Sequence, residues 1–153
     1  MTRTVVYSIA FLGLFVSLPF TSLLASPQDK SQQEKESKNG NGECVKSCQE
    51  CLVTLLICHK KCADLVANGD KSYANCMHSC LDCSEMCRAC MVICARKSPM
   101  MEILCEACAK TCDHCAKECA KFPDDPAIAE CTKKCQQCAE SCRNCIKMDN
   151  KPN

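Results

Sequence analysis

The chain has 153 residues and a formal net charge of +1, and it contains 21 Cys but only four Phe, two Tyr and no Trp. This length leaves room for one modest domain, and the near-zero charge gives no electrostatic reason to bind nucleic acid or an acidic membrane surface. Because bulky side chains are scarce, something other than an ordinary apolar core must hold the interior together. A Cys content above about 10% in a short chain is typical of a disulfide scaffold.

Residues 1–25 have the features of a secretory signal peptide, with Arg3, an apolar run over residues 5–18 and small residues at Ala25 and Ser26. The run is shorter than the roughly 20 residues that span a membrane, although an uncleaved anchor is an alternative because the cleavage site is not a clean A-x-A. A single arginine precedes the run, so the twin-arginine route is not supported. We expect export by a Sec-type signal to the periplasm or the exterior.

Residues 26–42 are polar and charged, without aromatic side chains or apolar periodicity. This composition predicts a disordered polar linker. A docking arm is the functional alternative, but composition alone favours the linker.

The cysteines all follow position 43 and recur almost throughout at intervals of three or four residues. This alternation is the stripe with which a helix faces a bundle core. Leu55 continues the first stripe between Cys51 and Cys58, and we predict one Cys-rich domain over residues 43–149. The four stripes are Cys44, Cys48, Cys51, Cys58 and Cys62; Cys76, Cys80, Cys83, Cys87, Cys90 and Cys94; Cys105, Cys108, Cys112, Cys115 and Cys119; and Cys131, Cys135, Cys138, Cys142 and Cys145.

Turn-forming residues divide this domain into four segments of similar length. Asn68-Gly69 predicts the end of the first helix. Ser98-Pro99 and Asp125-Pro126 each predict an N-cap followed by the first residue of the third and fourth helices. Connections of a few residues force neighbouring helices to be antiparallel, which predicts an all-α, up-down-up-down four-helix bundle with a Cys-lined core. The expected helices span about residues 43–67, 72–97, 99–121 and 126–148.

The spacing of the thiols disfavours disulfides within a stripe. Residues three or four apart on a helix have Cβ atoms about 5–6 Å apart, whereas a disulfide needs about 3.8 Å. The odd count of 21 also prevents complete pairing. A bridging metal fits better, because two metal–sulfur bonds of about 2.3 Å each span about 4.6 Å.

Charge favours copper(I) over other metals that bind thiolates. Thiolates select Cu(I), Zn(II) or iron–sulfur clusters, and iron–sulfur clusters usually sit in loops that wrap around them. A zinc site with four thiolates has a net charge near −2, so many such sites would bury negative charge at high cost. One Cu⁺ that replaces one thiol proton keeps the core nearly neutral, and we expect about one ion per cysteine, or about 20 ions.

Seven CxxC pairs occur in the chain. A single pair would indicate, weakly, a thiol oxidoreductase or a zinc ribbon. Each pair here is embedded in a continuous helical stripe, so these interpretations lose their structural context.

The stripes predict that the two ends of the bundle differ. One end should be an apolar plug, because the residues in register there are Leu65 or Val66, Tyr73, Phe122 and Ile128. The other end should stay rich in soft ligands, and we predict that copper enters there. Filling of gaps at helix termini is the alternative role of its methionines. The possible uptake ligands are Met100, Met101 and Met148.

The remaining side chains off the stripes point to the surface. His59, His78 and His114 are expected to be surface histidines. A second set of apolar residues predicts packing against another subunit, so we expect a homo-oligomer of even order. This set is Leu52, Val53, Leu56, Ile57, Met91, Val92 and Ile93.

Four stripes of CxxxC and CxxC in register, with a Met-bearing rim and an apolar rim, resemble the bacterial copper storage proteins. The resemblance covers about Cys44 to Met148. It implies a tetramer, and Cu(I) held by pairs of cysteines with adjacent ions clustered along the bundle axis. Exported members of that family use a twin-arginine signal, which this sequence lacks.

Storage or sequestration of many Cu(I) ions is therefore the leading functional hypothesis. A disulfide-stabilised secreted helical protein and a copper chaperone, metal-dependent regulator or zinc-binding protein are the alternatives. No nucleophile with its base, paired carboxylates or phosphate loop is present, so the sequence predicts neither an enzyme nor a small-molecule substrate. The sequence does not identify a recipient for the copper.

Overall fold

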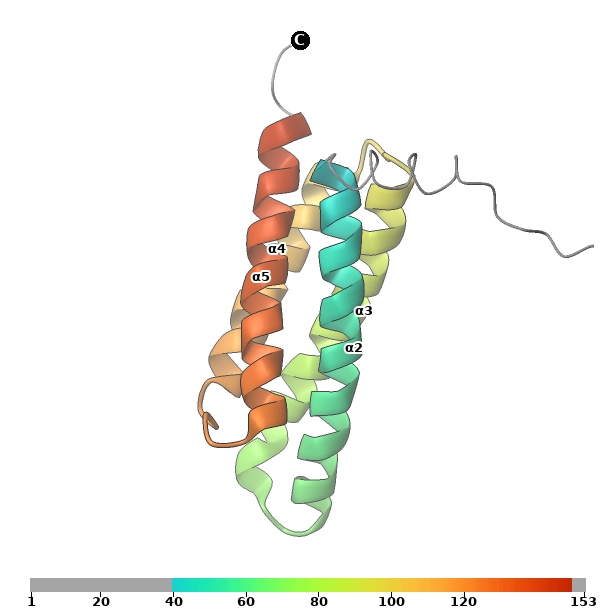
Figure 1. Ribbon diagram of the computed structural model, residues 1–153. Coiled ribbons are helices and arrows are strands. Elements are labelled where there is room, and N and C mark those ends of the chain that lie inside the picture. The colour runs from blue at the N-terminus through green and yellow to red at the C-terminus, as the bar shows by residue number, and fades with distance from the viewer. Residues whose placement is uncertain (1–39, 150–153) are drawn as a thin grey trace, which may run out of the picture.

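The computed structural model describes residues 40–149, which form four long helices around one axis (Figure 1). Successive helices are antiparallel neighbours, and α5 returns to lie beside α2. The predicted all-α, up-down-up-down four-helix bundle is therefore confirmed. The predicted signal peptide and residues 26–39 of the predicted linker lie outside the described residues. The helices are α2 (Gly40–Ala67), α3 (Ala74–Ala95), α4 (Met101–Cys119) and α5 (Pro126–Asp149), with a 3-10 turn, η1 (Lys71–Tyr73), before α3.

Helix α2 begins earlier than expected but ends where its turn residues predict. Its first residue is Gly40, so the last three residues of the predicted linker are helical. At the other end Gly69 has a φ of +101°, its N–H donates to the carbonyl of Val66, and the N–H of Asp70 donates to that of Leu65. These two bonds satisfy the last carbonyls of the helix, as in a Schellman motif.

The prediction that Ser98 and Pro99 begin the third helix is wrong. The Ser98 hydroxyl accepts a hydrogen bond from the Met100 N–H at 3.3 Å, and its carbonyl accepts from the Met101 N–H at 3.0 Å. Ser98 therefore closes a turn of its own, and α4 begins two residues later than expected, at Met101. Helix α4 also ends two residues early, at Cys119.

The connection before this turn explains why α3 stops at Ala95 rather than at residue 97. Lys97 has a φ of +50°, the left-handed conformation that ends a helix. Its N–H donates to the carbonyl of Cys94, and the N–H of Ser98 donates to that of Ile93. This is the same pair of bonds that ends α2, but with a lysine in the position that Gly69 occupies there.

The last two boundaries follow from aspartate caps. The predicted N-cap Asp125 is confirmed, because its Oδ1 accepts from the N–H groups of Ala127 at 3.0 Å and Ile128 at 3.2 Å. Asp70 caps η1 in the same way, since its side chain accepts from the Ser72 N–H at 3.1 Å. The 3-10 turn of η1 takes up the residues that were expected to begin the second helix, so α3 starts at Ala74.

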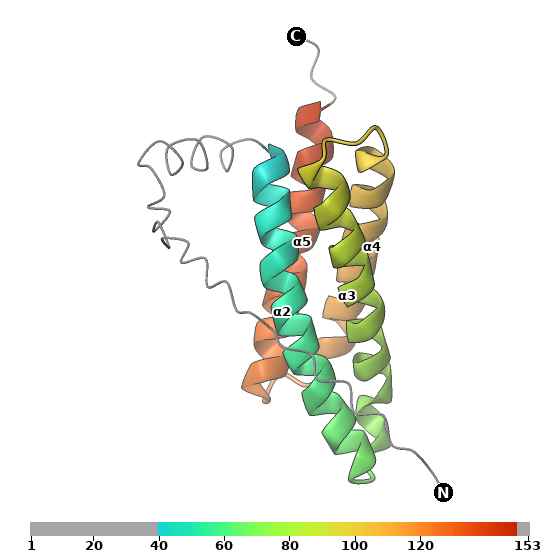
Figure 2. The ribbon, with the colours of Figure 1, turned by 90° about the vertical axis from the view of Figure 1, so that its right-hand side faces the viewer.

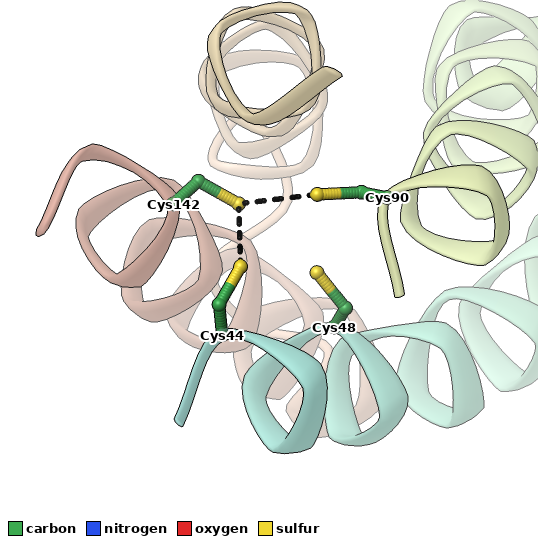
Figure 3. Close-up of side chains that lie close together, drawn as sticks. All are labelled: Cys44, Cys48, Cys90 and Cys142. Carbon is green, nitrogen blue, oxygen red and sulfur yellow. Dashed lines mark hydrogen bonds between the residues drawn. The ribbon is translucent and has the colours of Figure 1, made fainter. Parts of the chain in front are cut away.

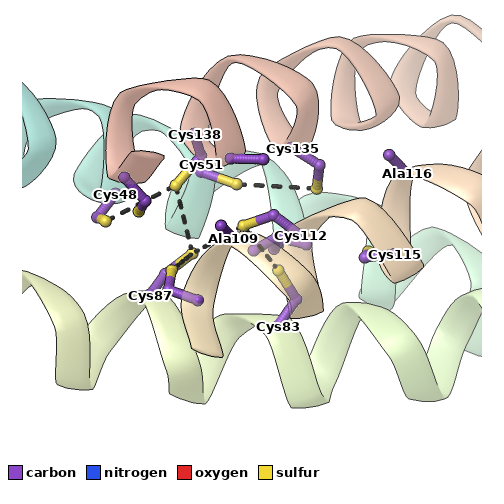
Figure 4. Close-up of a cluster of buried hydrophobic side chains, with 14 of the residues drawn as sticks. Cys48, Cys51, Cys83, Cys87, Ala109, Cys112, Cys115, Ala116, Cys135 and Cys138 are labelled. Carbon is purple, nitrogen blue, oxygen red and sulfur yellow. Dashed lines mark hydrogen bonds between the residues drawn. The ribbon is translucent and has the colours of Figure 1, made fainter. Parts of the chain in front are cut away.

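Cysteine fills the interior of the bundle. All 21 cysteines are buried, each with at most 1% of its surface exposed, and Leu55 and Ile128 are the largest fully buried side chains. Small residues lie between the stripes at the helix contacts, where Ala109 and Ala116 of α4 are drawn in Figure 4. Such small side chains let the helices approach closely enough for thiols from different helices to meet.

The bundle has two distinct ends. We call the open end the one formed by the start of α2, the connection between α3 and α4, and the last turns of α5 (Figure 2). The closed end consists of the last turns of α2, η1 and the connection between α4 and α5. Within residues 40–149, no helix is long and apolar enough to cross a membrane.

Candidate metal centre

The four helices each direct one stripe of thiols at the bundle axis. Helix α3 contributes six cysteines and the other three helices contribute five each. We call these 21 side chains the thiol core. The structure brings together all the cysteines that the sequence singled out, because residues that recur every three or four positions share one face of a helix.

One group of thiols shows how three helices build a single site (Figure 3). Cys44 and Cys48 lie on α2, Cys90 on α3 and Cys142 on α5, and their sulfur atoms all lie within 4.8 Å of one another. The Sγ of Cys142 is 3.7 Å from that of Cys44 and 4.0 Å from that of Cys90. These side chains converge on one point, so one ion could be bound there by two or more sulfurs.

Similar groups continue along the axis and share members. Cys44 belongs to two of them, as do Cys48 and Cys142, so neighbouring groups are joined through common sulfurs. A shared sulfur can bridge two ions, so the three groups that share Cys44, Cys48 and Cys142 form a continuous series of sites rather than isolated ones. Groups of this kind are Cys44, Cys48, Cys90 and Cys142; Cys44, Cys94, Cys105 and Cys145; Cys48, Cys108, Cys138 and Cys142; Cys51, Cys83, Cys87 and Cys112; and Cys58, Cys80, Cys119 and Cys131.

The distances between sulfurs suit coordination by two to four thiolates. With metal–sulfur bonds of about 2.3 Å, two sulfurs are about 4.6 Å apart across a linear ion and about 4 Å apart around a trigonal one. The Sγ atoms of Cys83 and Cys112 lie 3.5 Å apart. Those of Cys51 and Cys135 lie 3.8 Å apart (Figure 4). The sulfurs of each of these two pairs therefore need to separate by about 1 Å at most to bind a metal.

No disulfide joins the cysteines, all of which lie in the described part of the chain and are free. The sulfurs of Cys76 and Cys119 are 3.0 Å apart, well beyond the bond length of about 2.05 Å in a disulfide. The interior is thus a set of thiols held in contact, as the spacing along the stripes predicts.

The surroundings of the thiols favour a monovalent ion. Among residues 40–148, the buried polar or charged side chains are Ser79 and Ser84 alone, and no buried lysine or arginine is there to balance negative charge. Each serine hydroxyl donates to a carbonyl of its own helix, Ser79 to Cys76 at 3.0 Å and Ser84 to Leu81 at 2.7 Å. A core filled by zinc thiolates would stay strongly negative, whereas one filled by Cu(I) thiolates would be close to neutral.

Hydrogen bonds among the thiols shift their pKa values in opposite directions. Bonds with Cys105 and then Cys142 lower the pKa of Cys44 to about 2, and a bond with Cys142 is the largest cause that lowers the pKa of Cys105 to about 5. The pKa of Cys48 is raised instead, first by its bond with Cys108. Burial opposes ionisation in all three. Neighbours on one stripe therefore differ, with Cys44 favouring the thiolate and Cys48 the thiol.

The closed end is sealed by apolar side chains, as predicted. The rings of Tyr73 and Phe122 stack with their centroids 4.0 Å apart, and Ile128 in the first turn of α5 is fully buried. Tyr73 and Phe122 are partly buried and pack against the core, whereas Leu65 and Val66, which are also partly buried, are not among the side chains packed against it. The plug therefore consists mainly of Tyr73, Phe122 and Ile128.

The open end separates the three predicted uptake ligands. Met101 is buried, with 4% of its surface exposed, and its Sδ lies 3.9 Å from the Sγ of Cys145. Met100 and Met148 are about half exposed, at 46% and 45%. The structure thus places one thioether against the thiol core and two at the surface.

Asn41 is a neighbour of the thiol core that the sequence reasoning missed. Its side-chain oxygen accepts a hydrogen bond from the Sγ of Cys145 at 3.3 Å. The residue was assigned to the polar linker, but the spacing from Asn41 to Cys44 to Cys48 continues the intervals of three and four. That spacing is the feature of the sequence that could have placed Asn41 on the same helix face as the first stripe.

The histidines lie away from the thiol core. His78 and His114 are exposed, as predicted. His59 is partly buried, and its Nδ1 lies 3.1 Å from the carbonyl oxygen of Met77, which joins α2 to α3.

Sequence comparison decides the family. A family model described as copper storage protein matches residues 37–147. The chain belongs to the copper storage protein family. This membership confirms the resemblance drawn from the stripes, and it agrees with the expectation that the chain is not an enzyme, since the family is one of storage proteins. None of the curated proteins that were compared matches the chain.

Solved structures of the family have the same architecture. The chain is 27% identical to Cu(I)-bound copper storage protein BsCsp3, over 71% of this chain and 99% of that one, with a TM-score of 0.66. It is 28% identical to apo copper storage protein 3 from Bacillus subtilis, over 69% and 97% of the two chains, with a TM-score of 0.63. Copper storage protein Ccsp from Streptomyces lividans, loaded with 10 copper equivalents, is 22% identical over 80% and 93%, with a TM-score of 0.61, and supports the fold alone.

Proposed function

We propose that this copper storage protein holds about one Cu(I) ion per cysteine, or about 20 ions, along the axis of its bundle. The observation that carries the proposal is the thiol core itself, 21 buried free thiols in mutual contact without a buried cation among residues 40–148. Each Cu⁺ that displaces one thiol proton leaves the interior nearly neutral, so successive ions bind without a growing electrostatic cost.

An anaerobic titration of the reduced protein tests this capacity directly. Cu(I) is added in the presence of a competing chelator, and the copper bound per chain is measured after gel filtration. We expect tight uptake of about 20 equivalents. Saturation at one to four equivalents would instead indicate a copper chaperone. A count of free thiols in the protein as isolated separates storage from a disulfide scaffold, and the same titration with Zn(II) tests the zinc alternative.

The proposal includes uptake through the open end. Thioethers bind Cu(I) more weakly than thiolates, so Met100 and Met148 at the surface and Met101 beside Cys145 would receive an ion and pass it inward. Replacement of all three by Leu is expected to slow loading about tenfold while leaving the capacity unchanged, because Leu keeps the apolar volume and removes the sulfur. An unchanged loading rate would show that these methionines only fill space.

We also propose that the chain forms a homo-oligomer, a tetramer by analogy with the family resemblance. The outward sides of α2 and α3 expose an apolar face, whereas the only large exposed apolar residue of α4 in the described chain is Ile103. A second copy of the chain is the occupant we propose for this face. Of the surface set expected from the sequence, Leu52, Met91 and Ile93 are instead partly buried against the core. The residues of the apolar face are Val53, Leu56, Ile57, Leu81 and Val92.

Light scattering on a purified variant tests this assembly. Leu56→Glu would place a charge in the centre of the apolar face and is expected to lower the measured mass to that of smaller species. Ile103→Glu is the matched control, since Ile103 is also exposed, at 59% against 44% for Leu56, but lies on α4. Monomers in the parent protein would overturn the proposal.

Export is the final part of the proposal. Residues 1–25 carry the features of a Sec-type signal, which would deliver the chain unfolded and free of metal to the periplasm or the exterior. The mass of the mature chain recovered from each cell fraction tests this. Recovery of the full-length chain in the cytosol would contradict it.

A further inference from the structure

The first turn of α2 lies at the open end, beside α5 (Figure 1). Two contacts join these segments. Asn41 of α2 accepts a hydrogen bond from the Cys145 thiol at 3.3 Å, and Gly40 of α2 is buried against the side chain of Met148. Both partners on α5 belong to the set of thiol and thioether groups that would meet incoming copper first.

The contact with Asn41 orients the outermost thiol of α5. Cys145 lies within 4.8 Å of the sulfurs of Cys44, Cys94 and Cys105, and 3.9 Å from the thioether of Met101. The amide oxygen of Asn41 and the thioether of Met101 are alternative acceptors for the single S–H of Cys145, and the amide oxygen is the nearer and the stronger acceptor. When the S–H donates to Asn41, the sulfur lone pairs face the thioether and the neighbouring thiols.

The contact with Gly40 depends on the absence of a side chain. A Cβ at position 40 would lie 2.1 Å from Cε of Met148 and 3.2 Å from its Sδ. Any other residue would therefore push the end of this side chain away. Gly40 allows the Met148 thioether to lie close over the start of α2, at the rim of the thiol core.

We propose that Gly40 and Asn41 are positioning residues of a receiving site formed by Met148, Met101 and Cys145. This inference rests on the proposed copper storage. In the first step a Cu(I) ion leaves its donor ligand and forms a bond to the Cys145 sulfur, the thiol proton passes to solvent, and copper stays in the +1 state. The ion then moves to the group formed by Cys44, Cys94, Cys105 and Cys145, which shares Cys44 with the next group inward.

Stopped-flow transfer of one equivalent of Cu(I) from a coloured chelator to the full chain tests the role of Asn41. Asn41→Leu is expected to slow transfer about fivefold, the factor that corresponds to one ordinary hydrogen bond of about 1 kcal/mol. Asn41→Asp keeps the acceptor and should keep the parent rate. Asn75→Leu, an exposed position near the closed end, is the matched control and should also keep it.

The total capacity of each variant separates this inference from the storage function. We expect an unchanged capacity, because no sulfur ligand has been removed. Slower transfer with full capacity supports a positioning role, and a change in melting temperature alone would indicate a merely structural one and overturn the inference. A low capacity in the parent chain would overturn storage and this inference together.

A double-mutant cycle tests Gly40 even if Asn41→Leu folds poorly. Gly40→Ala is expected to slow transfer about threefold in the parent chain, since it displaces the Met148 thioether. In a Met148→Leu background the same change should have no effect, because the thioether is already absent. Equal effects in both backgrounds, or no effect in either, would overturn the assignment of Gly40.

Discussion

The two ends of the bundle close the same thiol core by different means. At the closed end, aromatic stacking between Tyr73 and Phe122 and the buried side chain of Ile128 exclude water with groups that do not bind metal. At the open end, Met101 covers the last thiols, while Met148 stays half exposed. A core that must admit ions needs one end whose outer side chains can also bind them. Thioethers lie at the open end and apolar groups at the closed end, so we expect ions to enter at the open end.

The largest effect expected from copper is on stability. A core of thiols buries less apolar area than one of leucines, and every ion that binds only the native state adds to its stability. Loading should raise the free energy of unfolding by more than about 4 kcal/mol and the melting temperature by about 20 °C.

Calorimetry of the apo and loaded forms measures this rise, and hydrogen exchange locates it. Amides in the first turn of α2 and the last turns of α5 should gain most protection, because the plug at the closed end is already packed without metal. Equal melting temperatures of the apo and loaded forms would contradict the expectation that copper stabilises the thiol core.

The closed end should be the more sensitive of the two to loss of apolar volume. Ile128→Ala would leave a cavity at a fully buried position and is expected to destabilise the apo protein by about 3 kcal/mol. Ile103→Ala near the open end, where the side chain is 59% exposed, should cost less than about 0.5 kcal/mol. Urea unfolding of both variants measures the difference, and similar losses would remove the distinction between the ends.

The pH dependence of copper binding should also distinguish individual thiols within each end, since burial raises the pKa of Cys145 at the open end as it does that of Cys62 at the closed end. The pKa of Cys105 is lowered, chiefly by its hydrogen bond with Cys142, so copper competes less strongly with a proton at this thiol. Near the closed end burial raises the pKa of Cys62 above its ordinary value. Copper must displace a proton from Cys62, and its affinity there should fall about tenfold per pH unit, or about 1.4 kcal/mol, as the pH is lowered.

Chelator competition at pH 7.5 and 5.5 measures this dependence. Cys62→Ser should make the overall loss of affinity smaller, since it removes a site that competes with a proton. Cys105→Ser should leave the dependence unchanged or make it steeper. A weaker pH dependence in Cys105→Ser than in Cys62→Ser would contradict the lowered pKa of Cys105 and the raised pKa of Cys62.

The features that recur along the sequence could be predicted, and those set by competition between neighbouring turns could not. Every cysteine lies in the core because intervals of three and four residues keep all members of a stripe on the same face of their helix. The cap at Asp125 was equally clear, since a single candidate precedes Pro126. Between α3 and α4, however, Ser98 could cap a helix or close a turn, and the left-handed Lys97 before it decides for the turn.

At the open end, Asn41 was missed for a related reason. Composition assigned residues 26–42 to a linker, while the hydrogen bond to Cys145 forms only once α5 lies beside α2. Local composition carries no information about such a partner, which is more than 100 positions away in the sequence.

The smallest expected effect comes from the two turns that end α2 and α3. Both turns place one residue in the left-handed conformation and form the same pair of hydrogen bonds, but the residue is Gly69 near the closed end and Lys97 near the open end. A side chain makes this conformation less favourable by about 1 kcal/mol. Lys97→Gly should therefore stabilise the apo protein by up to about 1 kcal/mol, and Gly69→Ala should destabilise it by a similar amount. Urea unfolding of the two variants measures both changes. If Lys97→Gly is destabilising instead, the lysine side chain contributes to the open end in a way that outweighs the strain of its backbone.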